Sequence, residues 1–228
     1  AVTAVSDSLR QDTYRNFKVT REVEVIPNFI ALNEYGQAKQ NCQRRMFAPN
    51  GERIMVHVSN FRKVKRVEDV LRVFDKVRKQ IPTRLVLVGD GPERPQIEKL
   101  CRELNTCDEI RSLGKVMNPA EVLSVADLFI LPSETESFGL SALEAMASHV
   151  PVISTNTGGL PEVNIHGVSG YLSNVGDVDD MAKNAIEILK DESTLQKFKA
   201  NAFKQAQNFD IHAILPQYEA LYERVLKA

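Results

Sequence analysis

From residue 53 onward, short runs of Val, Ile and Leu alternate with segments whose apolar residues recur at helical spacing. The run 54–58, for example, is followed by apolar side chains at three- and four-residue intervals, namely Val67, Val70, Leu71 and Phe74. Buried strands that alternate with helices predict a parallel sheet covered by helices on both faces. We therefore expect an α/β fold, a Rossmann-like doubly wound parallel sheet, whose ligands bind at the carboxyl ends of the strands.

The same pattern divides the chain into four parts. Residues 1–27 are expected to form a short strand and a helix capped by Ser6, and residues 28–52 a polar linker with one or two helical turns. The Rossmann-like domain extends over 53–210 and a last helix over 211–228. Because the chain starts without Met inside a β-like run, we expect residues 1–27 to be the remnant of a domain whose earlier part is absent. Strands are predicted at 23–26, 54–58, 84–88, 110–113, 128–131, 151–154 and 170–172, and helices at 7–16, 67–77, 97–104, 119–126, 140–147, 178–190, 192–207 and 212–227.

Composition narrows the class of function. The 228 residues have a net charge of −1, which gives no reason to expect nucleic acid or an anionic membrane as the main partner. No apolar run is long enough to cross a bilayer and no signal peptide opens the chain, so we expect a cytoplasmic protein. The four histidines form no ligand cluster, which disfavours a metal enzyme. The three cysteines cannot all pair and are expected to be reduced thiols, at Cys42, Cys101 and Cys107.

Two loops that follow strands have a composition suited to phosphate. The loop 59–66 carries four cations in five positions directly before a helix, and cations with free helix N–H groups suit a diphosphate. A solvated basic loop explains this segment equally well. The loop Gly89–Pro92 has glycines suited to positive φ and a proline suited to the first position of a helix, and turn chemistry alone explains it.

Two further loops add carboxylates and glycines. Glu136 follows a strand, Gly139 permits close approach of a ligand to the backbone, and Glu144 lies about a turn and a half into the next helix. Free N–H groups bind phosphate oxygens and carboxylates accept hydrogen bonds from sugar hydroxyls. The loop 155–162 supplies more free N–H groups at the same edge. Each loop alone also fits an ordinary connection, so the prediction of a nucleotide-sugar site depends on their convergence.

Glu136 and Glu144, with seven residues between them in the run E-S-F-G-L-S-A-L-E-A-M, resemble the E-x7-E motif of the retaining glycosyltransferases with the GT-B fold (family 4, glycogen-synthase-like). Segments 88–92, 157–162 and 167–172 resemble other signatures of this family, in its order. The resemblance covers the whole chain and implies the C-terminal, donor-binding half of a GT-B enzyme. The run S-N-F-R-K-V-K-R at 59–66, where most members have G-R-L, is similar to a subfamily that transfers N-acetylglucosamine from UDP-GlcNAc to L-malate in bacillithiol biosynthesis.

The resemblance also implies roles for individual residues. Lys65 would bind the donor diphosphate, with Arg62 in place of the family arginine whose position holds Asn60. Glu136 would contact the donor sugar, and Glu144 the ribose hydroxyls. No cofactor or metal ion would be needed, because cations and helix termini can neutralise the departing diphosphate. The other donor-binding positions implied are Ser59, Asn60, Gly89, the backbone at Lys115 and Val116 for uracil, and the amides of Phe138, Gly139 and Leu140.

The expected substrates are therefore a UDP-sugar and a small acceptor. Most of the acceptor site would lie in the absent N-terminal domain, so this fragment should bind UDP weakly and catalyse nothing alone. A nucleotide-sugar-binding module that works with a partner chain, and a transferase with another sugar acceptor, are alternatives. A dehydrogenase is disfavoured because no G-x-G-x-x-G follows the first strand of the sheet. The last helix is expected to cross back onto the absent domain, and the oligomeric state stays open, a homodimer included.

Overall fold

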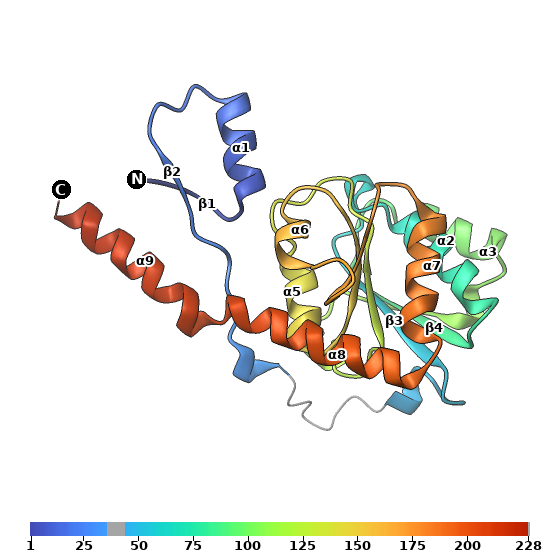
Figure 1. Ribbon diagram of the computed structural model, residues 1–228. Helices are drawn as coiled ribbons and strands as arrows, with labels where there is room; N and C mark the ends of the chain where they lie inside the picture. The colour runs from blue at the N-terminus through green and yellow to red at the C-terminus, as the bar shows by residue number, and fades with distance from the viewer. Residues whose placement is uncertain (36–43, 228) are drawn as a thin grey trace.

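The computed structural model describes residues 1–35 and 44–227 (Figure 1). Its centre is a six-stranded, all-parallel sheet in the order β5-β4-β3-β6-β7-β8. From β3 the chain adds β4 and then β5 toward one edge of the sheet. It then returns to place β6 on the other side of β3, so the switch point lies between β3 and β6. This confirms the predicted doubly wound sheet. The strands are β3 (Arg53–Val58), β4 (Thr83–Val88), β5 (Ile110–Gly114), β6 (Leu128–Leu131), β7 (Val152–Thr155) and β8 (Gly170–Ser173).

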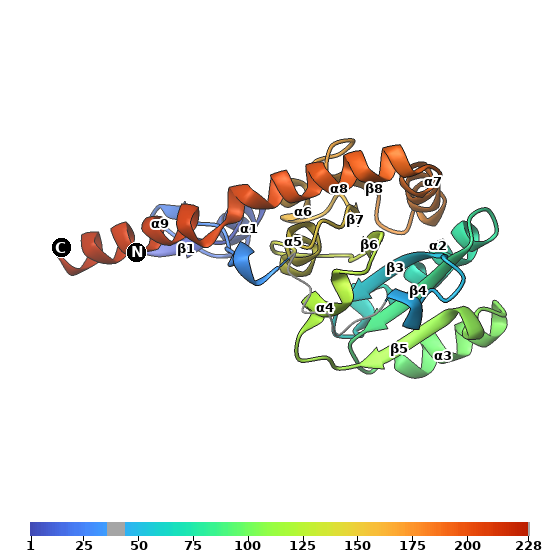
Figure 2. The same ribbon diagram turned by 90° about the horizontal axis from the view of Figure 1, so that it is seen from below.

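Helices cover both faces of this sheet because alternate strand residues point to opposite sides. Ile54 and Val56 pack in one apolar cluster with α4, α5 and α6, whereas Met55 packs in another with α2, α3 and α7. Helix α8 contributes to both clusters and runs along the edge of the domain (Figure 2). The helices are α2 (Val67–Arg78), α3 (Arg94–Glu103), α4 (Pro119–Leu123), α5 (Leu140–Ala147), α6 (Leu160–Val163), α7 (Val178–Leu189) and α8 (Glu192–Ala206).

The N-terminal residues form a small unit of their own, in which β1 (Val2–Ala4) pairs in parallel with β2 (Val23–Val25) across α1 (Asp7–Asn16). The Ser6 side chain caps α1 as predicted, by accepting a hydrogen bond from the Leu9 N–H. Helix α9 (Ile211–Leu226) leaves the sheet domain and runs beside this unit (Figures 1 and 2). Part of its apolar stripe is covered there, because Ile214 and Leu221 are buried with Ile26.

The linker predicted at 28–52 includes residues 36–43, which lie outside the described residues. Its described parts contain two short 3-10 turns, η1 (Leu32–Glu34) and η2 (Arg44–Met46). Ile30 is held at the junction before α9, where its N–H donates to the Phe209 carbonyl and its carbonyl accepts from the Ile211 N–H. The linker therefore begins beside the point at which the C-terminal helix departs.

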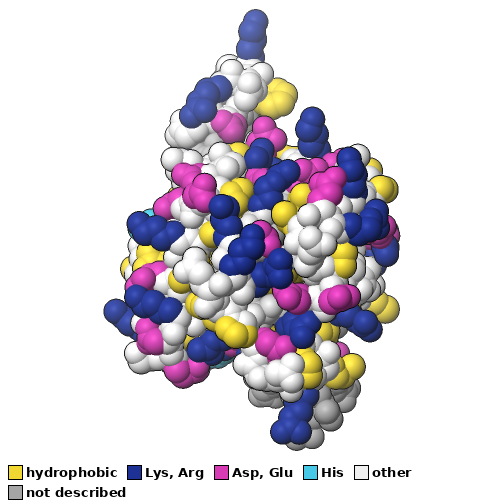
Figure 3. All heavy atoms as spheres, turned by 90° about the vertical axis from the view of Figure 1, so that its right-hand side faces the viewer, with side chains coloured by type: hydrophobic (Ala, Val, Ile, Leu, Met, Phe, Trp, Pro, Cys, Tyr) yellow, Lys and Arg dark blue, Asp and Glu magenta, His cyan; other side chains and the backbone are white. Residues whose placement is uncertain are grey.

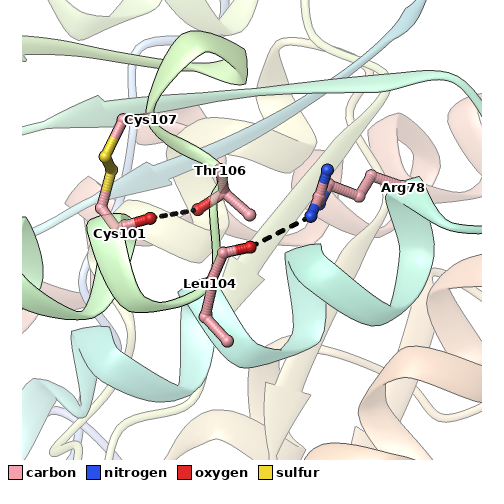
Figure 4. The surroundings of a disulfide bond; sticks show 5 residues. All are labelled: Arg78, Cys101, Leu104, Thr106 and Cys107. Atoms are coloured by element: carbon pink, nitrogen blue, oxygen red, sulfur yellow. Dashed lines mark hydrogen bonds between the residues drawn. A yellow bond between two sulfur atoms is a disulfide. The ribbon is translucent and has the colours of Figure 1, made fainter.

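The sequence predictions around α3 are wrong in two respects. Pro92 does not open a helix: it lies in a turn, and α3 begins at Arg94 with Pro95 in its first turn. Cys101 and Cys107 are not free thiols but form a disulfide (Figure 4). The chain folds back after α3, where the Thr106 N–H donates to the Cys101 carbonyl at 3.0 Å, and this turn brings the two Cα atoms to 5.2 Å. Cys42 lies outside the described residues.

The face formed by α2, α3 and α7 carries interspersed basic and acidic side chains (Figure 3). Several of them pair, as Arg72 does with Glu68 within α2 and Lys76 with Asp179 of α7. This face therefore presents mixed rather than single-sign charge.

Candidate functional site

Four loops meet at the carboxyl edge of the sheet, after β3, β4, β6 and β7. The loop after β3 contains the 3-10 turn η3 (Lys63–Lys65) and lies beside the loop after β6, because β3 and β6 are neighbours. The Glu134 N–H donates to the Val64 carbonyl at 2.8 Å and joins these two loops directly. The predicted convergence at the switch point is therefore present.

A lysine and a glutamate pair across this switch point. Lys65 Nζ lies 2.5 Å from Glu136 Oε2, and the two side chains are only 19% and 15% exposed. The Ser133 hydroxyl lies 3.4 Å from the same carboxylate oxygen. The site thus holds, side by side, a cation able to neutralise phosphate and a carboxylate able to accept hydrogen bonds from hydroxyl groups.

Gly158 lets the loops after β6 and β7 approach each other more closely than any side chain would permit. Its φ is +57°, and a Cβ atom built on it would lie 1.8 Å from the Glu136 carbonyl oxygen. The next N–H, from Gly159, donates to that same carbonyl at 2.9 Å. This contact fixes the backbone of Glu136 from the β7 side.

Gly89 has the same effect between the loops after β3 and β4. Its φ is +128°, and a Cβ atom would lie 1.8 Å from the Ser59 carbonyl oxygen. Its N–H donates to the Gly114 carbonyl at the end of β5, at 2.8 Å. The position predicted from sequence to contact the donor therefore also packs Ser59 against the β4 and β5 ends.

The start of α5 presents open backbone amides beside this pair. Gly139 occupies the N-cap position with φ +97° and no side-chain cap. Among the described residues, none of the N–H groups of Phe138, Gly139 and Leu140 has a protein acceptor. The Phe138 ring is buried against Phe209, which anchors the turn that holds these amides. Open N–H groups at a helix start suit an anionic ligand.

Glu144 lies on the second turn of α5 and is partly buried. Burial raises the pKa of its carboxyl group above the ordinary value. Within the described residues no cation lies within ion-pair distance of it. Tyr35 has its pKa raised to about 12, mainly by burial and then by the nearby carboxylates of Glu144 and Glu34. No sequence signal pointed to Tyr35.

His57 is a second residue that the sequence did not indicate. It is fully buried on β3, its Nδ1 lies 2.8 Å from the Ile130 carbonyl oxygen, and its Nε2 lies 2.7 Å from Ser59 Oγ. Its imidazole lies near Phe61 and Phe129, with ring centroids 6.3 and 6.5 Å away. His57 lies two residues before the basic loop 59–66, and this position is its one signal in the sequence, because a single histidine does not form a cluster of metal ligands.

The other predicted positions are more dispersed. Arg62 is exposed and lines a groove with Lys63, Arg66 and Glu93, a groove that does not include Lys65. Asn60 is exposed in the same loop. At the end of β5, Lys115 is exposed and Val116 packs against the core. The roles implied for Arg62, Asn60, Lys115 and Val116 stay predictions.

Helix α1 closes one side of the site. The Ser6 hydroxyl donates to the Ser137 carbonyl at 2.6 Å. The Glu162 carboxylate of α6 accepts hydrogen bonds from the N–H groups of Asp7 and Ser8, at 2.9 and 3.0 Å. Between α1 and the loops lies a cleft of about 610 Å³, lined by Ser8, Leu9, Asp12, Arg15, Thr135, Glu136, Ser137, Thr157 and Gly158.

A sheet of this order, with a cation, open amides and carboxylates at its switch point, defines a Rossmann-like domain equipped for a phosphorylated ligand. The sequence matches the family Glycosyl transferases group 1 over residues 39–205, and the chain belongs to that family. Within residues 1–35 and 44–227, none of the helices combines the length and the apolar character that crossing a bilayer requires.

One curated relative is similar over almost the whole chain. The chain is 42% identical to N-acetyl-alpha-D-glucosaminyl L-malate synthase of Bacillus anthracis, over 99% of this chain and 60% of that protein. It thus spans about three fifths of the length of this curated relative.

Solved structures share the fold. Sucrose-phosphate synthase from Thermosynechococcus elongatus superimposes with a TM-score of 0.86 and 28% identity, over 99% of this chain and 58% of that one. HepE of Anabaena, solved in complex with UDP and glucose, superimposes with a TM-score of 0.91 and 22% identity, over 98% of this chain and 63% of that one. The latter likeness shows the fold alone.

Proposed function

We propose that this chain is the donor-binding half of a retaining glycosyltransferase that moves N-acetylglucosamine from UDP-GlcNAc to L-malate. The observation that carries the proposal is the Lys65–Glu136 pair at the switch point, beside the open amides of Phe138, Gly139 and Leu140. Similarity to the Bacillus anthracis synthase supports this choice of donor and acceptor.

The donor would bind along the edge of the sheet. Lys65 and the amides at the start of α5 hold the diphosphate, because both bring positive charge to its oxygens. Glu136 accepts hydrogen bonds from the donor sugar once Lys65 turns to phosphate. Glu144, which lacks a cation partner in the described residues, accepts hydrogen bonds from the ribose hydroxyls.

The reaction would be a front-face displacement. The bond from the anomeric carbon to the β-phosphate oxygen breaks, and a bond to the acceptor hydroxyl oxygen forms on the same face. The acceptor proton passes to the departing phosphate oxygen, so charge and atoms balance. The protein contributes orientation and stabilises the charge of the departing UDP and of an oxocarbenium-like sugar. With Lys65 and the amides opposing this charge, we propose that no metal ion takes part.

Donor binding can be tested directly by calorimetry on the chain with UDP. The Glu144→Gln variant keeps the shape of the side chain but loses its charge, and it should weaken UDP binding about 10- to 100-fold, the range for a charge-assisted hydrogen bond. Glu219→Gln, the same exchange on the exposed surface of α9, should bind UDP like the unchanged chain. If the unchanged chain binds no UDP, the proposed function is wrong. If Glu144→Gln binds UDP normally, Glu144 does not hold the ribose.

Transfer is tested with UDP-GlcNAc and L-malate, with the product followed by mass spectrometry. We expect binding without turnover, because the chain spans 60% of the related synthase and, within the described residues, the loops face α1 across the cleft. Measurable transfer would contradict the view that a further domain completes the acceptor site. Full transfer on adding a separate partner chain would instead favour a nucleotide-sugar-binding module.

A further inference from the structure

The buried imidazole of His57 lies between a carbonyl oxygen and a hydroxyl oxygen. Nδ1 faces the Ile130 carbonyl at 2.8 Å, and a carbonyl oxygen can only accept a hydrogen bond. Nδ1 must therefore carry a proton. This contact joins β3 to β6, the two strands that flank the switch point.

The second nitrogen then follows from the charge of the ring. His57 is completely buried, and Lys65 adds a positive charge nearby, so the neutral imidazole is favoured and its pKa falls to about 4. A neutral ring protonated at Nδ1 has a bare Nε2, which can only accept. The Ser59 hydroxyl, 2.7 Å from Nε2, must therefore donate its proton to His57.

This arrangement determines what Ser59 can offer to a ligand. A serine hydroxyl has one proton and two lone pairs, and the proton is already used. Ser59 is partly buried at the start of the loop that carries Lys65, and any further group that approaches its Oγ meets lone pairs only. A phosphate oxygen placed against it would bring two acceptors together, whereas a hydroxyl group would complete its hydrogen bonding.

We infer that His57 is a positioning residue that holds the Ser59 hydroxyl as a hydrogen-bond acceptor for a hydroxyl group of the bound nucleotide sugar, and not for its phosphates. The inference rests on the proposed function for the identity of the ligand. The tautomer of His57 does not depend on any ligand, so the two can fail separately.

The tautomer is tested by long-range ¹H–¹⁵N correlation spectra of the chain at pH 7, with His57 assigned by its absence from the His57→Gln spectrum. We expect a protonated Nδ1 and an unprotonated Nε2. A ring protonated at Nε2 instead, or at both nitrogens, would leave Ser59 as an acceptor from His57 and would overturn the inference.

The role of Ser59 is tested by UDP-GlcNAc affinity. Ser59→Ala should bind UDP-GlcNAc about three- to tenfold more weakly, the range for one neutral hydrogen bond. His57→Asn can still donate to the Ile130 carbonyl but has no acceptor that reaches Ser59, and it should also bind more weakly. His57→Gln restores an acceptor near the Nε2 position and should recover part of that loss. His212→Gln, an exposed histidine of α9, is the control and should bind like the unchanged chain.

Whether His57→Asn weakens or strengthens UDP-GlcNAc binding shows whether Ser59 contacts a hydroxyl group or a phosphate oxygen. If Ser59 faced a phosphate oxygen, releasing its proton would strengthen binding, so tighter or unchanged affinity overturns the inference. Ser59→Ala made on the His57→Asn background should cause little further loss of UDP-GlcNAc affinity, because each change by itself already removes the Ser59 hydroxyl held by His57. If His57→Asn does not fold, the nitrogen spectra and Ser59→Ala still decide. If the unchanged chain binds no UDP-GlcNAc, the proposed function fails and the tautomer is judged by the spectra alone.

Discussion

Lys65 Nζ lies 2.5 Å from Glu136 Oε2, and this ion pair joins two loops that are 71 residues apart in sequence. The pair occurs where β3 and β6 lie side by side, so the order of the sheet creates it. Under the proposed function, Lys65 would leave its carboxylate for a phosphate and Glu136 would then accept a hydrogen bond from a sugar hydroxyl, so binding of the diphosphate and of the sugar would be linked.

The coupling between Lys65 and Glu136 should exceed that of an exposed pair. Because both side chains are largely buried, removing either charge leaves the other without a partner in a poorly solvated place. Lys65→Met and Glu136→Gln should each destabilise the chain, and the double variant should recover about 1 kcal/mol relative to their sum. The measurement is a double-mutant cycle by urea denaturation.

The matched control for that cycle is Lys99 with Glu103 on α3, an exposed pair 3.7 Å apart. Lys99→Met and Glu103→Gln should show a coupling of only about 0.3 kcal/mol. Equal coupling energies in the two cycles would mean that the pair at the switch point contributes no more than a surface contact.

Gly158→Ala should separate the loops after β6 and β7. The added Cβ would lie 1.8 Å from the Glu136 carbonyl, and the positive φ alone costs an alanine about 1 kcal/mol. We expect a loss of stability larger than that and weaker UDP binding, measured by denaturation and calorimetry. Gly167→Ala is the control, because Gly167 has φ +74° but nothing within 4 Å of its added Cβ. Similar losses in both variants would show that the close approach at Gly158 is unimportant.

Glu162→Gln should loosen α1 from the sheet domain. The Glu162 carboxylate accepts hydrogen bonds from two N–H groups at the positive end of α1. A negative charge there contributes roughly 0.3–1 kcal/mol to stability. Hydrogen exchange followed by mass spectrometry should be about two- to fivefold faster over residues 7–16 and unchanged over β3 and β6. Glu219→Gln provides the control on α9. Unaltered exchange in α1 would mean that the Ser6–Ser137 hydrogen bond holds the helix by itself.

His57 should make the fold sensitive to acid. Burial, and then the charge of Lys65, lower the pKa of His57 from 6.5 to about 4 in the folded state. As pH falls from about 6.5 toward 4, the unfolded chain binds a proton that the folded chain does not, so stability should fall by about 3 kcal/mol across this window and level off below it.

The test of this pH dependence is urea denaturation of His57→Gln at pH 7, 5.5 and 4.5. The variant should lack this part of the acid sensitivity, so its stability relative to His212→Gln should improve as the pH falls. A constant difference between these two variants from pH 7 to 4.5 would show that His57 does not titrate differently in the folded and unfolded chains.

Regular elements were predictable because periodicity is a local property. The strand 128–131 and the helix 140–147 have the bounds that their apolar residues predict. Local turn chemistry was less reliable: Pro92 has the right residue type for the first position of a helix, but the chain needs another turn before α3 begins at Arg94. The disulfide of Cys101 and Cys107 was missed because spacing alone does not reveal how α3 folds back.

The sequence by itself determined the class of fold, the order of the loops and the candidate carboxylates Glu136 and Glu144, because these depend on residue types and on spacing along the chain. The choice of Lys65 within the basic loop came from the resemblance to a known family. Only the tertiary structure decided that Lys65 pairs with Glu136, that Gly158 touches the Glu136 backbone and that His57 Nε2 lies 2.7 Å from Ser59 Oγ. Those contacts join residues on different strands, and their distances follow from the crossovers and close packing of the sheet rather than from any local pattern.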